Sequence, residues 1–338
     1  MKLTLSLSPH VHGDDSVRKN MYGVCLALVP AMISSFVFFG LGAVAVTAVS
    51  VASCVFIEWA INKYLFRNPK PSVTDGSAIL TGILLAFNLP SGIPLWIVII
   101  GALFAIGVVK MTFGGLGCNL FNPALASRAF LLISFPAQMT DWPVACQGFA
   151  AVDAVSGATP LALMKEAVKT GNADVLKGLP DTLDMFIGNT GHTIYGAGPM
   201  GSGCLGEVCA LALILGFIFL IANKIITWHI PVSILATVAV FTGLLHMADP
   251  MYASPAEHLL SGGLLLGAIF MATDYVTSPM TRKGQVIYGI AIGFLTVVIR
   301  TWGAYPEGMS FAILIMNAFT PLINNYCKPR RFGEVVGK

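Results

Sequence analysis

The stretch Ser156-Gly157-Ala158-Thr159-Pro160 offers a hydroxyl group beside small residues, directly before a run of helix formers that ends near Lys169. Thr159 suits an N-cap and Pro160 suits the first helical position, so the sequence predicts a helix that begins here. One interpretation is a capped loop helix and nothing more. Another is phosphate attachment, because a hydroxyl between small residues is sterically open, and an esterified phosphate would lie beside the free amides at the helix start. The spacing alone does not decide between these interpretations.

A second candidate site is the glycine-rich segment 113–123, which contains Asn119 and Asn122. In a helical start, residues three apart share one face, so the two amides would offer donors and acceptors to a polar heteroaromatic ring. Segment 303–309 is a similar interruption between two apolar runs. The alternative is that both segments are tight turns between helices.

Charged residues within apolar runs form a third group of candidates. Such charges are costly in hydrocarbon, so each is a candidate for an ion path or for a structural pair at a helix end. The five residues are Lys110, Arg128, Glu207, Asp274 and Arg300.

Several classes of site are not predicted. The seven cysteines are scattered without Cys-x-x-Cys spacing, so no metal or iron–sulfur site is predicted, and no catalytic residue is assigned. The net charge of +3 includes no basic block that would follow a nucleic-acid backbone. Nucleic acid is therefore excluded as a partner. The N-terminal residues do not resemble a removable signal peptide.

The elements that must position these residues are membrane helices. The 338 residues are 56% hydrophobic and 10% charged, with a mean hydropathy of +0.81, whereas soluble domains carry roughly 25% charged residues. A helix needs about 20 apolar residues to cross the bilayer. Ten spans are predicted, at 21–40, 42–61, 76–90, 94–112, 119–135, 203–223, 229–246, 258–276, 284–302 and 309–326. The predicted fold is thus an all-α integral membrane protein.

The distribution of Lys and Arg predicts the orientation of these spans. Alternate connections carry the basic residues, namely Arg18, Lys19, Lys63, Arg67, Lys70, Lys224, Arg282, Lys283, Lys328, Arg330 and Arg331. Both termini are therefore predicted to be cytoplasmic. The long acidic loop 136–202, which contains Thr159, is predicted to face outward.

An internal repeat is predicted from a shift of 186 residues. The shift aligns Pro69 with Pro255, Gly76 with Gly262, Ala86 with Ala272, segment 105–107 with 291–293, and Gly117 with Gly303. Because five spans separate the copies, equivalent helices cross in opposite directions, as in inverted-repeat transporters. The predicted organisation is a segment 1–20, a five-helix repeat 21–135, the loop 136–202, a second repeat 203–327 and a tail 328–338.

The chain resembles the family of D subunits of Rnf ferredoxin:NAD oxidoreductase complexes and the related B subunits of the sodium-pumping NADH:quinone oxidoreductase. The resemblance covers nearly the whole chain. It rests on five ordered motifs: Ser8-Pro9-His10 with Met21, the segments 117–124 and 156–159, Gly203-Cys204-Leu205-Gly206-Glu207, and Met271-Ala272-Thr273-Asp274 with the block up to Leu314. One departure is Tyr275, where most relatives are expected to have proline.

The resemblance implies one covalent flavin and leaves open a second, noncovalent one. FMN would be joined to the Thr159 hydroxyl by a phosphoester bond, with Ser156, Gly157 and Ala158 completing the attachment sequence. A noncovalent riboflavin-type site in some members implies a role for Asn119 and Asn122. The short lead before the first span favours the Rnf group over the quinone-linked relative.

The resemblance also implies partners and a place in the cell. The chain would be an electron relay that is coupled to Na⁺ or H⁺ movement in the bacterial inner membrane. Its partners would be the A, B, C, E and G subunits of the Rnf complex, of which G is the outer flavoprotein, and a flavin transferase would attach FMN. An alternative from another class is a secondary transporter of a small polar solute, because of the repeat and the interrupted helices.

Overall fold

The structure is a computed structural model that describes residues 16–67, 73–143, 157–188, 192–193, 196–197, 203–305 and 307–328. The predicted roles of Ser156, of the motif at Ser8 and of the tail beyond Lys328 lie outside these residues. Nearly every described element is helical, and one antiparallel pair, β1 (His192–Thr193) with β2 (Gly196–Ala197), is the exception among them. The expectation of a helical membrane protein is confirmed at this level.

The first half and the loop contain α1 (Val17–Ala60), η1 (Ile61–Leu65), η2 (Val73–Asp75), α2 (Ser77–Phe87), α3 (Leu95–Ala102), η3 (Leu103–Met111), α4 (Pro123–Ser134), α5 (Pro136–Met139), α6 (Pro160–Thr170), η4 (Ala173–Gly178) and α7 (Thr182–Ile187). The second half contains α8 (Ala210–Ala222), α9 (His229–Ala248), α10 (Pro255–Leu260), α11 (Leu264–Leu266), η5 (Gly267–Met271), α12 (Arg282–Trp302) and α13 (Met309–Tyr326). By length and composition, α1 with η1, α9 and α12 are each long and apolar enough to cross a membrane.

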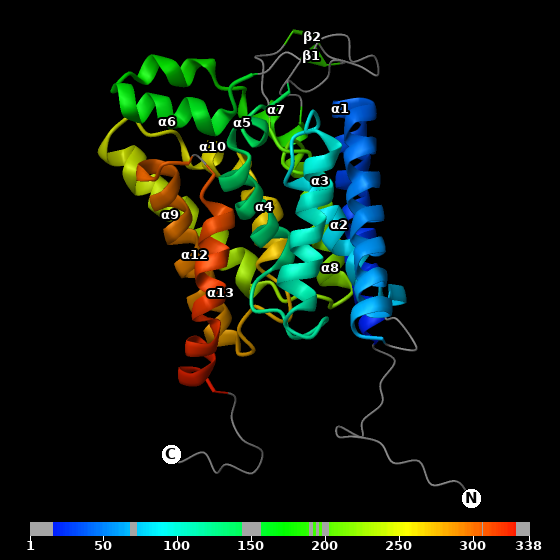
Figure 1. Cartoon of the computed structure of the whole chain (residues 1–338). Helices are drawn as coiled ribbons and strands as arrows, with labels where there is room; N and C mark the ends of the chain where they lie inside the picture. The colour runs from blue at the N-terminus through cyan, green and yellow to red at the C-terminus, as the bar shows by residue number, and fades with distance from the viewer. Residues whose placement is uncertain are drawn as a thin grey trace, which may run out of the picture.

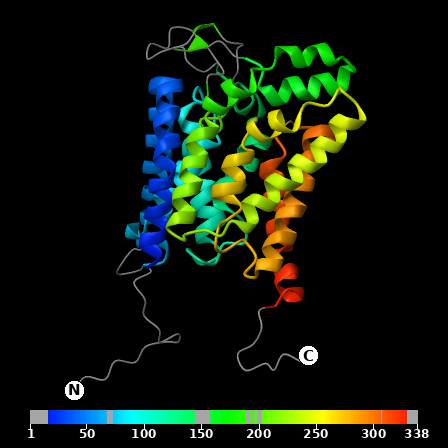
Figure 2. The same cartoon turned by 180° about the vertical axis from the view of Figure 1, so that it is seen from behind.

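Helix α1 is two helices joined at Gly40, whose φ of 62° and ψ of −145° are not helical. Residues near both ends of α1 meet at the same place, since Asn20 lines a cavity beside Lys110 while Glu58 bonds to Lys110. In Figures 1 and 2 both ends of α1 lie at the same end of the bundle. The chain therefore reverses at Gly40, where spans 21–40 and 42–61 were predicted to meet.

The helical bundle has two faces (Figures 1 and 2). We call the end with α6 and α7 the loop face, and the end where α1 begins and α13 finishes the terminal face. The predicted loop and the two described ends of the chain are thus on opposite faces. Which face is cytoplasmic stays a prediction, because the structure contains no membrane.

Glycine allows close packing between the helices. A Cβ atom at Gly82 of α2 would lie 2.7 Å from the Cα of Val51 in α1, and one at Gly293 of α12 would lie 2.8 Å from the Cβ of Thr237 in α9. Small residues at such crossings let membrane helices approach closely. The core between them is apolar and includes Phe87, Leu131, Leu213 and Tyr288, each at most 1% exposed.

Three predicted spans begin or continue differently from the prediction. Span 203–223 becomes helical only at Ala210, because the amides of Leu205 and Gly206 bond instead to the carbonyls of Leu89 and Phe87 at the end of α2. Span 119–135 becomes helical only at Pro123.

Span 258–276 is broken between α10 and α11, where Gly262 has a left-handed φ of 66°. Backbone that leaves the helical pattern is tolerated at membrane depth only where protein groups satisfy it. Arg300 does so here, because its guanidinium donates to the carbonyls of His258 and Ser261.

The element bounds keep the offset of the predicted repeat. Helix α4 begins at Pro123 and α13 begins at Met309, which is 186 residues later. The break between η3 and α4 is likewise matched by the break between α12 and α13. The inverted repeat and the number of ten spans stay predictions.

Candidate functional site

Thr159 is the N-cap of α6, as the sequence predicts. Its φ of −73° and ψ of 151° are extended, its hydroxyl accepts from the Ala162 amide at 3.2 Å, and Pro160 occupies the first helical position. The side chain is only 5% exposed, so the prediction of an open hydroxyl is wrong in this folded state. Its neighbours Gly157 and Ala158 are more exposed, and the Gly157 amide donates to the Trp142 carbonyl at 3.0 Å. The hydroxyl therefore lies at a positive helix end, covered by the surrounding chain.

Helix α6 is fixed to the second half of the bundle at two of the breaks. Leu161 packs against Gly262 so closely that a Cβ atom there would collide with it. The ammonium group of Lys165 donates to the carbonyls of Gly303 and Ala304, at 2.6 and 2.7 Å, where α12 ends. Burial lowers the pKa of Lys165, and the charge of Lys169 adds to this effect. The loop helix thus contacts both interrupted segments of the second half.

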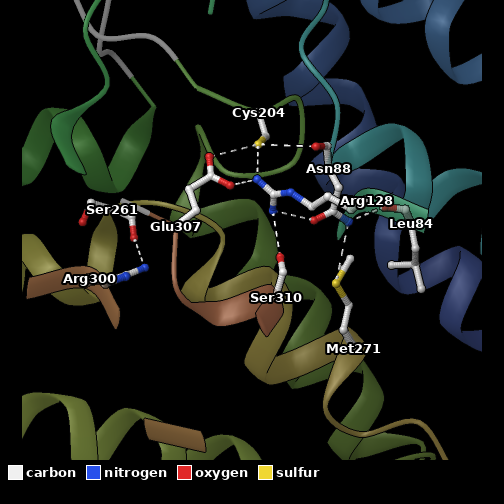
Figure 3. A network of polar contacts seen from close by, with 9 residues as sticks. All are labelled: Leu84, Asn88, Arg128, Cys204, Ser261, Met271, Arg300, Glu307 and Ser310. Carbon is white, nitrogen blue, oxygen red and sulfur yellow. Dashed lines mark hydrogen bonds and ion pairs between the residues drawn. The ribbon is translucent and has the colours of Figure 1, made fainter. Parts of the chain in front are cut away.

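A buried polar network lies beneath the loop face, with Arg128 of α4 at its centre (Figure 3). Its guanidinium pairs with Glu307, a residue of the break before α13. Nη1 also donates to Asn88 Oδ1 at 2.9 Å and to Ser310 Oγ at 3.1 Å, while Nη2 lies 3.4 Å from Cys204 Sγ. Residues from three distant parts of the chain therefore converge on one cation.

Glu207 lies beside this network. One ligand atom each from Cys204, Glu207 and Glu307 lies within 4.8 Å of the others. Glu207 is 9% exposed, and its Oε2 has no hydrogen-bond partner among the described residues. The carboxyl group borders a small cavity with about 300 Å³ of empty space, part of it solvent, that is also lined by Pro160, Met185 and Ser261.

A larger cavity lies towards the terminal face. Its empty space, including the open mouth, is about 810 Å³. This volume is within the size range of small-molecule and cofactor sites. Polar groups line an otherwise apolar wall, and they include Lys110, Asn119, Asn122, Thr273 and Asp274. The cavity reaches α1, α2, η3, α8 and η5, so it lies where the two halves meet.

The two asparagines reach this cavity in different ways. Asn122 is the N-cap of α4, with its Oδ1 accepting from the Ala124 and Leu125 amides, and its Nδ2 donates to the Met271 carbonyl at 3.2 Å. Asn119 lies before the helix and donates to the Phe121 carbonyl at 3.1 Å. Its Nδ2 also lies 3.5 Å from Asp274 Oδ2. The prediction of one helical face is wrong, but both residues line the same cavity.

Lys110 forms a buried ion pair at the wall of the cavity. Its Nζ lies 2.6 Å from Glu58 Oε2 and 2.6 Å from Ser77 Oγ, with both charged side chains at most 3% exposed. Glu58 in turn belongs to the second helix of the α1 hairpin. The pair ties α1, α2 and η3 together.

The structure therefore divides the predicted residues into two groups. Lys110, Asn119, Asn122 and Asp274 share the terminal-face cavity, while Arg128, Glu207 and Arg300 lie under Thr159 and the loop face. Sequence reasoning missed the partners Glu58, Asn88, Cys204, Glu307 and Ser310. An acidic residue within an apolar run was an available signal for Glu58, whereas Cys204 resembled a packing residue.

Comparison with known proteins gives a consistent result over the full length. Residues 4–333 match the model of the NQR2, RnfD, RnfE family. The chain is 47% identical, over 98% of its length and 96% of the relative's, to the D subunit of the Na⁺-translocating ferredoxin:NAD⁺ oxidoreductase complex of Acetobacterium woodii. It is 42% identical, over the same shares, to the D subunit of the proton-translocating ferredoxin:NAD⁺ oxidoreductase complex of Clostridium ljungdahlii. A third relative, at 41% over 94% and 93%, is the D subunit of the ion-translocating oxidoreductase complex of Stutzerimonas stutzeri.

Proposed function

Because the chain belongs to the NQR2, RnfD, RnfE family, we propose that it is the D subunit of an ion-translocating ferredoxin:NAD⁺ oxidoreductase complex. The relatives that carry this name are matched over 96% of their own length. The family model also covers the NQR2 group, to which the quinone-linked alternative belongs. The chain carries no nucleotide-binding or iron–sulfur motif, so it acts as a relay within the complex.

The observation that carries the redox role is Thr159 at the N-terminus of α6. The hydroxyl is the proposed point of FMN attachment, through a phosphoester bond. The residues fit this group, because the 11-residue helix directs its positive end towards a phosphate at its cap. A flavin bound there supplies the electron-transfer chemistry, and the protein supplies position and electrostatics.

The remaining residues of the site hold this helix in place. Lys165 and Leu161 fix α6 to the ends of α12 and α10, directly above the charged network of Arg128. A charged group attached at Thr159 would therefore interact electrostatically with the buried charges of the Arg128 network. Because Thr159 is 5% exposed, attachment by a transferase requires its hydroxyl to become accessible first.

We also assign the terminal-face cavity to a noncovalent flavin of the riboflavin type. Its apolar wall suits the faces of a flat ring system, and Asn119, Asn122 and Thr273 offer hydrogen-bonding groups at its edge. In the proposed orientation this cavity opens to the cytoplasm and Thr159 faces outward. The other proteins of the complex would then contact both faces.

Flavin attachment is tested in cells that contain the transferase. The full chain, denatured and separated by gel electrophoresis, is expected to show flavin fluorescence at its own mass. Thr159→Val is expected to abolish the signal, whereas Thr170→Val at the other end of α6 keeps it. A dark wild-type band, or a bright Thr159→Val band, contradicts the proposal.

The orientation is tested by labelling a cysteine placed at position 159 from outside intact cells that lack the transferase. A membrane-impermeant reagent is expected to react with the single-cysteine variant once α6 is displaced by mild warming. Reaction only after the membrane is permeabilised would place Thr159 on the cytoplasmic side.

A further inference from the structure

Two carboxyl groups, Glu207 and Glu307, lie near Arg128 beneath the loop face, but only one of them is paired with its guanidinium. Glu307 is paired with Arg128, but Glu207 Oε2 receives no hydrogen bond from any described residue. Arg300, the other cation nearby, donates instead to the carbonyls of His258 and Ser261. A buried carboxylate oxygen without a hydrogen-bond donor is unfavourable, and the attraction of Arg128 and Arg300 offsets only part of the loss of water around Glu207.

The spacing of the acidic groups matches a bound metal ion. Ligand atoms of Glu207, Glu307 and Cys204 lie within 4.8 Å of one another, so an ion midway between two of them is at most about 2.4 Å from each. Oxygen ligands hold Ca²⁺ at about 2.3–2.6 Å, and Na⁺ has nearly the same radius. A neutral thiol is a poor ligand for a hard cation, so the carboxylate oxygens are the expected ligands.

The approach to Glu207 is from the loop face. Glu207 borders the cavity that Pro160, Met185 and Ser261 also line, and this cavity has room for a particle the size of a water molecule. Water in the cavity can complete the coordination of an ion. The same cavity reaches the first residue after Thr159, so the ion would enter beside the proposed flavin.

We infer that Glu207 and Glu307 form a binding site for one Na⁺ ion on the loop-face side of the bundle. The nearby guanidinium of Arg128 opposes a second positive charge, so the site is weak and exchanges its ion readily. Weak binding suits an ion that must leave again, as in other pathways through membranes. The purpose of the site rests on the proposed ion-translocating function, but the binding itself does not require a flavin.

The experiment measures Na⁺ binding to the full purified chain in detergent. The melting temperature is compared in NaCl and in choline chloride at equal ionic strength, and bound ²²Na⁺ is measured directly. Wild type is expected to bind Na⁺ and to be stabilised by it in a saturable way. Glu207→Gln is expected to lose both effects, whereas Glu166→Gln, an exposed carboxyl on α6, keeps them.

Glu307→Gln provides a sharper result. It frees Arg128 to pair with Glu207, so Na⁺ binding is expected to disappear although Glu207 is intact. If Glu207→Gln does not fold, Glu207→Asp withdraws the carboxylate by one methylene group and is expected to weaken Na⁺ binding at least tenfold.

Three results would overturn the inference. They are a wild-type chain that binds no ²²Na⁺, Na⁺ binding that survives in both glutamine variants, and a stability that responds to pH but not to Na⁺, which would assign the site to a proton. Thr159→Val is expected to retain Na⁺ binding. Failure of flavin attachment and failure of ion binding are therefore separate outcomes.

Discussion

The ammonium group of Lys165 lies 2.6 Å from the carbonyl oxygen of Gly303, which joins the loop helix α6 to the end of α12. A cation at the C-terminal end of a helix satisfies carbonyl groups that have no partner within the helix and interacts favourably with the helix dipole. The contact spans 138 residues of sequence. It places the helix that Thr159 caps in a fixed relation to the break that carries Glu307.

Lys165→Met is expected to destabilise the protein by about 2 kcal/mol, because two hydrogen bonds from a charged donor are lost while the aliphatic stem remains. Thermal unfolding of the purified chain measures this change. Lys169→Met, which removes an exposed charge from the same helix, is the control and is expected to have little effect. Equal effects of the two substitutions would show that the carbonyl contacts contribute nothing.

Arg128→Met is expected to cost about 3 kcal/mol, because Glu307 would be left partly buried without its partner. Adding Glu307→Gln to Arg128→Met is expected to restore part of this loss, since the unpaired charge is then removed. A double-mutant cycle from denaturant unfolding gives the coupling between the two residues. A coupling near zero would mean that Asn88 and Ser310, rather than Glu307, account for the role of Arg128.

Lys110→Met is expected to destabilise the bundle by about 3 kcal/mol, because Glu58 is fully enclosed and would keep an unpaired charge. Glu58→Gln in the same chain is expected to recover stability. Lys63→Met removes an exposed charge of η1 that lies over the Trp59 ring, is expected to cost at most about 1 kcal/mol, and serves as the control. The prediction fails if Lys110→Met and Lys63→Met unfold at the same temperature.

Asn119→Leu is expected to weaken riboflavin binding about fivefold, which corresponds to one lost hydrogen bond at the edge of the ring. Titration by quenching of riboflavin fluorescence measures the affinity. Asn122 is less suitable for this test, because its substitution also removes the N-cap of α4. Asn325→Leu, at the exposed end of α13, is the control, and the same affinity in both variants would exclude Asn119 from the site.

Local features of the fold were predictable from the sequence. The N-cap at Thr159, the helix that follows it and the change of direction near residue 40 all depend on neighbouring residues. The break at Gly262 was not predicted, because the apolar run continues through it. The donor that satisfies the carbonyls of His258 and Ser261 is Arg300, which is 42 and 39 residues away in sequence. The late start of α8 has a similar cause, since the amides before it bond to the end of α2.

Individual residues of the candidate sites were predictable from the sequence, but which of them lie together in space was not. Lys110 and Arg128 were identified because a charge in an apolar run is conspicuous, yet their partners Glu58 and Glu307 come from elements 52 and 179 residues away. Only the fold decides which charges meet. The same holds for Asn119 and Asp274, which are 155 residues apart and line one cavity.

The reversal at Gly40 has a consequence for how the protein enters the membrane. A continuous 44-residue helix would be about 66 Å long, roughly twice the hydrocarbon thickness, so its two arms must cross as a pair. The connection between the two arms at Gly40 is so short that almost no residues extend beyond the membrane there. The insertion machinery must therefore accept both arms together as a helical hairpin, and a reporter or protease site placed at this turn would disrupt biogenesis before it reported on topology.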